Sequence, residues 1–463
     1  MGTSLAITTK EMFMKSRLAV FSLLIFVTCS GMAQPPQHDA RISGLLQKIS
    51  ADSLEATVRK LAQFGTRHTL SDTVSPIRGI GAAREWIKST FERFAGNSEG
   101  RLTVAFDRSI VQPSKRIPRP TEIVNVIATL SPARASATPA TRTIVVSAHY
   151  DSRASDIMDS TSDAPGADDD GSGTALVLEL ARVLSPYEFN TTIVFACFSG
   201  EEQGLLGSSA WLRRLQADGM QIVAVLNNDI VGNVVGGDGS AESSYVRIFS
   251  EAYSPQDTGF AFQRRNALGL ENDGPSRSLA RYVKEMGGQY LEAFRGEMIY
   301  RLDRFLRGGD HEPFHQAGYA AVRLSEVKEN YAHEHQNIRT DSGRALGDLP
   351  DFLDWGYLAN VARLNAATIA SLAWAPDPPA EPTIVTDKLE YVTRLNWKKS
   401  RDPDLAGYYV RYRKTASPDW EFSSFTTETN CTLNISKDDY IFGIQSVNSH
   451  GDCGLISLPM PSR

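Results

Sequence analysis

The chain has 463 residues, of which 41% are hydrophobic and 22% charged, the composition of an ordinary soluble globular protein with two or three domains. Its formal net charge is −6, from 48 basic and 54 acidic residues, and the sequence contains no long run of Lys and Arg. This charge balance gives no support to a nucleic-acid surface, so we expect no nucleic-acid partner.

The N-terminus is typical of an export signal. Two basic residues precede the apolar run 18–27, and small residues follow that run as far as Ala33. This order predicts a signal peptide at 1–33 and a secreted or periplasmic protein, because about ten apolar residues are too few to span a bilayer. Lipidation of Cys29 is the less favoured alternative, since the three residues before it match a lipoprotein signal poorly.

A short polar linker at 34–41 leads into the main part of the chain. Residues 42–94 have the apolar spacing of helices, and strands and helices alternate from residue 104 onward. Near-continuous apolar or β-branched runs predict buried strands at 122–130, 143–149, 191–198, 221–226 and 320–324. Helices are expected near 173–184, 207–215, 276–295 and 349–372. Apolar strands separated by helices predict an α/β fold, with a mostly parallel mixed sheet covered by helices on both faces.

The C-terminal part of the chain has a different pattern. Residues 376–382 are rich in proline and form a linker. Beyond it, 383–463 has the short alternating strands of a small all-β sandwich. With Trp397 on an early strand and tyrosines on later ones, this pattern resembles a fibronectin type III domain, and we expect it to contact a surface or a partner. Cys431 and Cys453 could form a disulfide in an oxidising compartment, and the sequence leaves this open.

Three consecutive carboxylates, Asp168, Asp169 and Asp170, lie between a Pro-Gly turn and the Gly-Ser-Gly start of an apolar helix. Adjacent like charges repel each other, so ordinary packing gives no reason to cluster them, whereas a bound cation does. A solvated acidic loop that caps the helix is the alternative interpretation. The motifs around this stretch favour the cation.

Further metal-ligating side chains end the predicted strands. His149 and Asp151 end one strand, Glu201 and Glu202 follow the next, and Asp229 follows a third. In sheets of this kind, ligands bind beyond the carboxyl ends of the strands. A mixture of imidazole and carboxylate suits zinc, although cobalt or manganese could bind the same set.

Taken in order, these motifs are similar to those of the secreted bacterial di-zinc aminopeptidases of peptidase family M28, in clan MH. The similarity covers residues 42–375 and implies a zinc-exopeptidase-like fold for that domain. The motifs that carry it are His149-Tyr150-Asp151, PGADDDGSG at 165–173, FSGEEQGLLGS at 198–208, Asn228-Asp229 and GDHEPF at 309–314.

The resemblance implies a site with two zinc ions. His149 and Asp229 would bind one ion, Glu202 and a late histidine would bind the other, and Asp169 would bridge the two. These five ligands come from five separate positions along the chain.

The resemblance also implies roles for residues beside the ligands. Glu201 would be the general base, which takes a proton from the zinc-bound water and passes it to the leaving amine. Asp151 would orient the imidazole of His149. Asp168 would shape the backbone beside the bridging carboxylate, and Asp170 would cap the helix that follows.

The late histidine is the point where the chain departs from the family's common pattern, Tyr-His-Thr-x-x-Asp. Here residues 331–337 are Tyr-Ala-His-Glu-His-Gln-Asn. The spacing of four residues to the acidic position selects His333 as the ligand, with Asn337 where Asp usually stands. His335 is the alternative, and His311 is interpreted as a pocket residue.

These motifs together predict a secreted zinc metallopeptidase that removes N-terminal residues from peptide or protein substrates. A carboxypeptidase or a glutaminyl cyclase on the same fold is the second interpretation. A non-catalytic binding protein is the third. We expect the irregular region 233–310 to set the side-chain preference.

Overall fold

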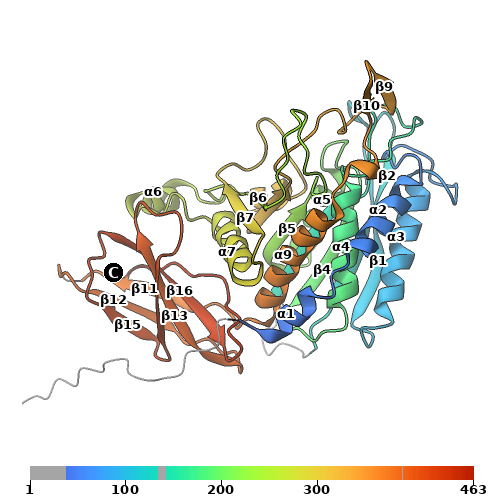
Figure 1. The fold of residues 1–463 in the computed structure, drawn as a ribbon. Helices are drawn as coiled ribbons and strands as arrows, with labels where there is room; N and C mark the ends of the chain where they lie inside the picture. Colours follow the sequence, from blue (N-terminus) through green and yellow to red (C-terminus); the bar gives the residue numbers. More distant parts are fainter. Residues whose placement is uncertain (1–37, 134–141, 388, 463) are drawn as a thin grey trace, which may run out of the picture. The chain divides into compact units, whose positions relative to one another are not determined.

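A computed structural model describes residues 38–133, 142–387 and 389–462 (Figure 1). The expected signal peptide and Cys29 lie outside these residues, so export of the protein stays a prediction. The described residues belong to one unit, and the domain boundaries expected around 375 and 383 also stay predictions. Within these ranges, no helix is both long enough and apolar enough to cross a membrane.

An eight-stranded mixed sheet with the order β1-β2-β4-β3-β5-β8-β6-β7 lies at the centre of the main part of the chain. The middle strands β4, β3, β5 and β8 run parallel. Strand β2 is antiparallel to both of its neighbours, and β6 is antiparallel to β8. The strands are β1 (Leu102–Val111), β2 (Thr121–Leu130), β3 (Arg142–His149), β4 (Thr192–Phe198), β5 (Gln221–Asn228), β6 (Tyr245–Phe249), β7 (Arg295–Ile299) and β8 (Ala321–Ser325). The expected α/β class with a mixed sheet is confirmed.

Helices cover both faces of this sheet, which explains the apolar sequence of its middle strands. Side chains alternate between the two faces along a strand. In β3, Ile144 and Val146 pack in the core that contains α4, whereas Val145 packs in the core that contains Trp211 of α5. The helices are α1 (Ala40–Leu46), α2 (Ala51–Ala62), α3 (Gly79–Ala95), α4 (Gly171–Leu184), α5 (Leu206–Ala217), α6 (Gly259–Ala267), α7 (Pro275–Tyr290), α8 (Glu312–Gln316), the 3-10 turn η1 (Pro350–Phe352) and α9 (Trp355–Trp374).

Two expected helices have different ends in the structure. The helix expected over 276–295 is α7, and it ends at Tyr290 because the chain next forms β7, which pairs with β6. The helix expected over 349–372 begins later, as α9. It starts where the carboxylate of Asp354 accepts a hydrogen bond from the backbone N–H of Tyr357, which is an N-cap.

The last part of the chain forms two small sheets, with the orders β15-β12-β11-β17 and β14-β13-β16. They share an apolar core, in which Trp397 and Tyr408 pack edge to face with ring centroids 5.3 Å apart. Strand β11 begins inside the expected linker, and Pro382 lies where its register with β12 shifts, a usual place for proline. The strands are β11 (Ala380–Val385), β12 (Thr393–Lys398), β13 (Leu405–Lys414), β14 (Phe422–Thr426), β15 (Asn430–Leu433), β16 (Tyr440–Asn448) and β17 (Met460–Ser462). The likeness to fibronectin type III stays a prediction.

A buried ion-pair cluster joins these C-terminal sheets to α7. The carboxylate of Asp273, just before α7, pairs with Arg281 on α7 and with Arg413 on β13, each at 2.7 Å. The side chains of all three residues are at most 3% exposed. Two further ion pairs, which are less buried, add to this contact: Lys284 pairs with Asp419, and Glu285 pairs with Arg411.

Candidate active site

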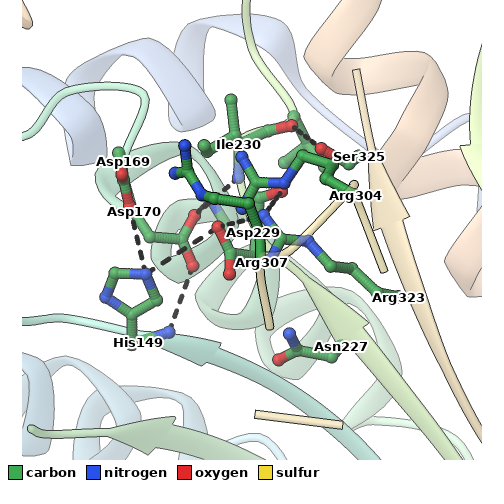
Figure 2. A network of polar contacts seen from close by, with 12 residues as sticks. His149, Asp169, Asp170, Asn227, Asp229, Ile230, Arg304, Arg307, Arg323 and Ser325 are labelled. Carbon is green, nitrogen blue, oxygen red and sulfur yellow. Dashed lines mark hydrogen bonds and ion pairs between the residues drawn. The ribbon is translucent and has the colours of Figure 1, made fainter. Parts of the chain in front are cut away.

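The candidate ligands gather at one edge of the central sheet, where parallel strands end. His149 is the last residue of β3, Glu202 follows β4 and Asp229 follows β5. The loop before α4 brings Asp169 to the same edge. Figure 2 shows the side chains of His149, Asp169 and Asp229 directed toward one another. All four of these side chains are buried, and the neighbouring Glu201 is partly buried. The fold therefore concentrates carboxylates where little water can screen their charge.

The carboxylate of Asp169 lies between two imidazoles. His149 Nε2 is 3.1 Å from Asp169 Oδ1 and 3.8 Å from Asp229 Oδ1. His335 Nε2 is 2.7 Å from Asp169 Oδ2 and 2.9 Å from Glu202 Oε1. The two oxygens of Asp169 therefore face two different groups of donors, which is the arrangement a bridging carboxylate requires.

His335, and not His333, is the late histidine that joins this cluster, so the choice made from the spacing is corrected. The ring of His333 stacks face to face on Phe352, with centroids 3.6 Å apart. His335 has a φ of 52°, and this left-handed turn directs its side chain toward Asp169. His311 is buried with Nε2 2.8 Å from the carbonyl of Leu302, away from the cluster.

The donors of this cluster fit a cation. His149 Nδ1 lies 3.1 Å from the carbonyl of Asp151, which can only accept, so Nδ1 carries the proton. Its Nε2 then faces carboxylates, which leaves its lone pair for a metal. His335 Nε2 and Glu202 Oε1 are buried and lie 2.9 Å apart, yet within the described residues neither is aligned in a hydrogen bond. Around a tetrahedral zinc ion, ligand atoms lie about 3.3 Å apart, close to the separations around Asp169.

The pKa values show how strongly these carboxylates attract positive charge. Burial alone would lower the pKa of His149, but the charge of Glu201 and the contacts with three aspartates raise it well above its ordinary value. Burial is likewise outweighed at His335, where Glu202 and Asp169 raise the pKa to about 11. In the absence of a cation, protons would have to balance the negative charge at both imidazoles.

Two further carboxylates lie near these ligands, and the structure gives each a different setting. Glu201 Oε2 is 4.0 Å from His149 Nε2, which is more distant than Asp169. Glu334 also approaches Asp169 and His335, but its charge is already paired with Arg307. We therefore keep Asp169 as the shared ligand and treat Glu201 as a group beside the metal site.

Asp151 contacts both halves of the cluster. Its carboxylate accepts a hydrogen bond from Thr69 Oγ1 at 2.9 Å and from the backbone N–H groups of Glu201 and Glu202 at 3.3 Å. Its Oδ1 lies 3.6 Å from His149 Nδ1. Asp151 thus holds the imidazole and the Glu201–Glu202 turn in one arrangement, which supports a positioning role.

The other two aspartates of the acidic stretch hold the backbone. Asp170 Oδ1 accepts from the N–H of Gly173 at 2.9 Å, so the expected cap of α4 is confirmed. Its Oδ2 accepts from the N–H of His149 at 3.1 Å. Asp168 Oδ1 accepts from the N–H of Gly232 at 2.9 Å. Each carboxylate of the stretch therefore has a separate partner.

Comparison with known proteins identifies the family. Residues 125–368, more than half of the chain, match the model of peptidase family M28. The chain belongs to peptidase family M28. A protein of Leptosphaeria maculans named "Probable zinc metalloprotease" is 43% identical over 428 residues, which are 92% of this chain and 98% of that protein. A protein of the same name from Pyricularia oryzae is 39% identical over 430 residues, 91% of this chain and 85% of its own.

Solved structures share the fold of this M28 metalloprotease. LapB of Legionella pneumophila has a TM-score of 0.53 at 19% identity and covers 73% of this chain and 76% of its own. The LapA aminopeptidase of the same organism has a TM-score of 0.52 at 19% identity, with coverage of 74% and 77%. The bacterial source expected from the sequence is wrong, because the curated relatives with full-length similarity are fungal.

The sequence did not reveal the residues that hold the backbone around the acidic stretch. Arg67 is fully buried, and its guanidinium donates to the carbonyls of Tyr150, Pro165 and Gly166. Asp348 accepts from the backbone N–H groups of two of the clustered aspartates, Asp168 and Asp169, at 2.8 Å each. Both residues lie in loops far from their partners in sequence, so no local pattern marks them.

Arg323 is a third missed residue, and the sequence does contain a signal for it. It lies in the apolar run of β8, where a charged side chain is unusual. Its Nη2 is 2.8 Å from Asp229 Oδ1, and Figure 2 shows this guanidinium directed toward Asp229. Burial raises the pKa of Asp229, but Arg323 and His149 outweigh burial and keep that pKa below its ordinary value. Asp229 therefore remains a charged ligand.

A cleft of about 410 Å³ opens over the cluster. Its lining contains the ligands, Glu201 and several arginines from different loops. The lining residues are Arg116, His149, Arg153, Asp169, Glu201, Glu202, Gly204, Leu205, Asp229, Arg304, Leu306, Arg307, Gly308 and His335. A cleft of this size accommodates a small ligand.

Proposed function

We propose that this chain is a secreted two-zinc aminopeptidase. The observation that carries the proposal is the carboxylate of Asp169, whose two oxygens face His149 and His335 on opposite sides. His149 and Asp229 would hold one zinc, His335 and Glu202 the other, and Asp169 both. Bound there, zinc would supply Lewis-acid activation of a water molecule and of the substrate carbonyl.

Glu201 is the residue that we propose moves the proton. Its carboxylate lines the cleft beside His149 and is not needed as a ligand. Burial and the charges of Asp229, Glu202 and Asp310 raise the pKa of Glu201 above its ordinary value, although His149 opposes them. A carboxylate that lines the cleft without serving as a ligand can accept a proton from water and then donate it to the leaving amine.

The cleft supports removal of one terminal residue rather than cleavage within a chain. Its volume of about 410 Å³ is in the range of small-ligand pockets, which agrees with binding of a chain end. The fold is shared with the Legionella LapA aminopeptidase, which agrees with an N-terminal specificity. The side-chain preference expected from 233–310 would come from the loops around this cleft.

Glu201→Gln tests the mechanism. We expect kcat/KM to fall 10²- to 10⁴-fold, because a neutral amide cannot accept the proton. Glu326→Gln is the matched control, because it makes the same change from carboxylate to amide at a buried glutamate that lies outside the cleft lining. Activity of Glu201→Gln near that of wild type would overturn the assigned role.

A substrate panel tests the reaction. Peptides with a free N-terminus, an acetylated N-terminus, an amidated C-terminus and an N-terminal Gln are compared by mass spectrometry. We expect the first residue to be released from the free and the C-amidated peptides and not from the acetylated one. Release of the C-terminal residue would show a carboxypeptidase, and ring closure of the N-terminal Gln would show a glutaminyl cyclase. If two zinc ions are bound and no peptide reacts, the chain is a binding protein.

Two parts of the proposal are tested separately. N-terminal sequencing of protein recovered from the culture medium would locate the processing site, which we expect after Ala33. Metal analysis of the purified protein should give two zinc ions per chain. A single ion, or retention of the full N-terminus in cells, would contradict the corresponding part.

A further inference from the structure

Four arginines line the cleft, and they come from three separate loops. Arg116 lies between β1 and β2, Arg153 follows β3, and Arg304 and Arg307 precede α8. The four carboxylates in the same lining are Asp169, Glu201, Glu202 and Asp229, which form the metal cluster and its base. Every other charged residue of the lining, within the described part of the chain, is an arginine.

Two of these arginines are neutralised by the protein itself. Arg304 Nη1 lies 2.9 Å from Glu329 Oε2, and Arg307 pairs with Glu334. Figure 2 shows Arg304 and Arg307 beside Asp229. Their charge is therefore largely balanced by carboxylates outside the cleft lining.

Arg116 and Arg153 have no such balance. Arg116 Nη1 donates to the backbone carbonyl of Glu202 at 3.0 Å and, within the described residues, forms no ion pair. Arg153 donates to the carbonyls of Ala154 and Ser155, and its nearest carboxylate oxygen, on Glu202, is 3.9 Å away. A guanidinium presents five donors, so both residues retain donors for a ligand.

Contacts with the protein orient both guanidinium groups, although Arg116 is an exposed side chain and Arg153 is largely buried. The side chain of Arg153 is only 18% exposed, and its contacts with backbone carbonyls fix its plane. Both arginines adjoin Glu202, one through its backbone and one near its carboxylate. A pair of cationic side chains next to a metal ligand favours an anion bound close to the reacting atoms.

We propose that Arg116 and Arg153 form an anion subsite that selects peptides with a carboxylate near the scissile bond. The inference rests on the proposed peptidase function and specifies its substrate class. The carboxylate could belong to an acidic side chain at the first or second residue, or to the C-terminus of a dipeptide. Arginine binds a carboxylate through paired N–H donors in each case.

Isosteric substrate pairs test the proposal. Wild-type kcat/KM is measured for peptides with Glu against Gln at the first position, Glu against Gln at the second, and a dipeptide acid against its amide. We expect the carboxylate member to be preferred about 10- to 100-fold at one of these positions, the effect of a hydrogen bond to a charged group. The preferred position identifies the source of the carboxylate. Ratios within about threefold of one at all three positions would overturn the proposal.

Variants assign the preference to the two arginines. Arg153→Gln and Arg116→Gln should each reduce the carboxylate-to-amide ratio about tenfold or more, and Arg153→Glu should favour a Lys peptide over its Glu counterpart. Arg119→Gln, an exposed arginine in the same loop as Arg116, is the matched control and should retain the wild-type ratio. Unchanged ratios in both cleft variants would refute the assignment, and circular dichroism shows that each variant is folded.

A binding readout separates failure of this inference from failure of the proposed function. Glutarate and its neutral counterpart glutaramide are titrated into the Glu201→Gln protein by calorimetry. We expect glutarate to bind at least about tenfold more tightly, and Arg153→Gln to remove this difference. Selective glutarate binding without any peptide cleavage would refute the peptidase and retain the anion subsite. Peptide cleavage together with equal binding of glutarate and glutaramide would refute the anion subsite and retain the peptidase.

Discussion

The pair His333 and His335 offers a direct test of the metal site. The two imidazoles are two residues apart, both belong to one loop, and the structure gives them opposite surroundings. His335 Nε2 lies 2.7 and 2.9 Å from Asp169 and Glu202, whereas His333 stacks on Phe352. We predict that His335→Ala empties one metal position and that His333→Ala leaves both positions filled.

The expected magnitudes differ because the lost contacts differ. Loss of a residue that only orients a metal ligand typically costs 10- to 100-fold in affinity or activity, so loss of a ligand should cost at least about 100-fold in kcat/KM. This corresponds to about 3 kcal/mol or more of transition-state stabilisation. Loss of the stacked ring of His333 should instead cost about 0.5–1.5 kcal/mol of unfolding free energy.

Two measurements on both variants decide the question. Metal content by mass spectrometry should fall from two zinc ions to one in His335→Ala and stay at two in His333→Ala. The value of kcat/KM on a peptide with a free N-terminus should follow the metal content. The reverse outcome, with metal and activity lost only in His333→Ala, would refute the assignment from geometry and restore the one from sequence spacing.

Two further predictions concern stability, measured by urea unfolding. Arg67→Met leaves four buried carbonyls, that of Leu61 among them, without this donor. It should lower the unfolding free energy by about 3–5 kcal/mol, and a loss below about 1 kcal/mol would contradict the role of this guanidinium. Asp303 is a buried carboxylate that pairs with Arg323 at 3.1 Å and with Arg304 at 3.3 Å. Burial raises its pKa, but Arg323, His311 and Arg304 outweigh burial and hold the pKa at about 2. Because this pKa lies below the unfolded value near 3.9, Asp303 contributes about 2.5 kcal/mol above about pH 4, and that contribution is lost as the pH falls toward 2. Asp303→Asn should therefore destabilise the protein at neutral pH and progressively less in acid, and a loss independent of pH would contradict the ion pairs.

The fold could be predicted because its signals are local. The continuous apolar runs of β3 and β4 follow from burial on both faces, and each face is visible in the alternation of residues such as Val145 and Val146. Ligands at strand ends could be predicted for the same reason, since parallel strands bring their carboxyl ends to one edge.

The rest of the site depends on contacts between distant loops. Arg67 reaches Gly166, 99 residues away in sequence, and Asp348 reaches Asp168, 180 residues away. The error at His333 has a different cause. Spacing along the chain favours His333, but the left-handed backbone of His335 determines which ring faces Asp169.

The buried cluster of Asp273, Arg281 and Arg413 has a consequence for how this protein can be cut. Cleavage of the chain in the segment between α9 and β11 would break its covalent continuity but not these charge contacts, so the two fragments should remain associated as a nicked protein. Complete removal of the C-terminal sheets would instead take one arginine from Asp273 and uncover the rest of the cluster. A shortened chain therefore differs from the intact one in the stability of its catalytic part as well as in the loss of a possible contact surface.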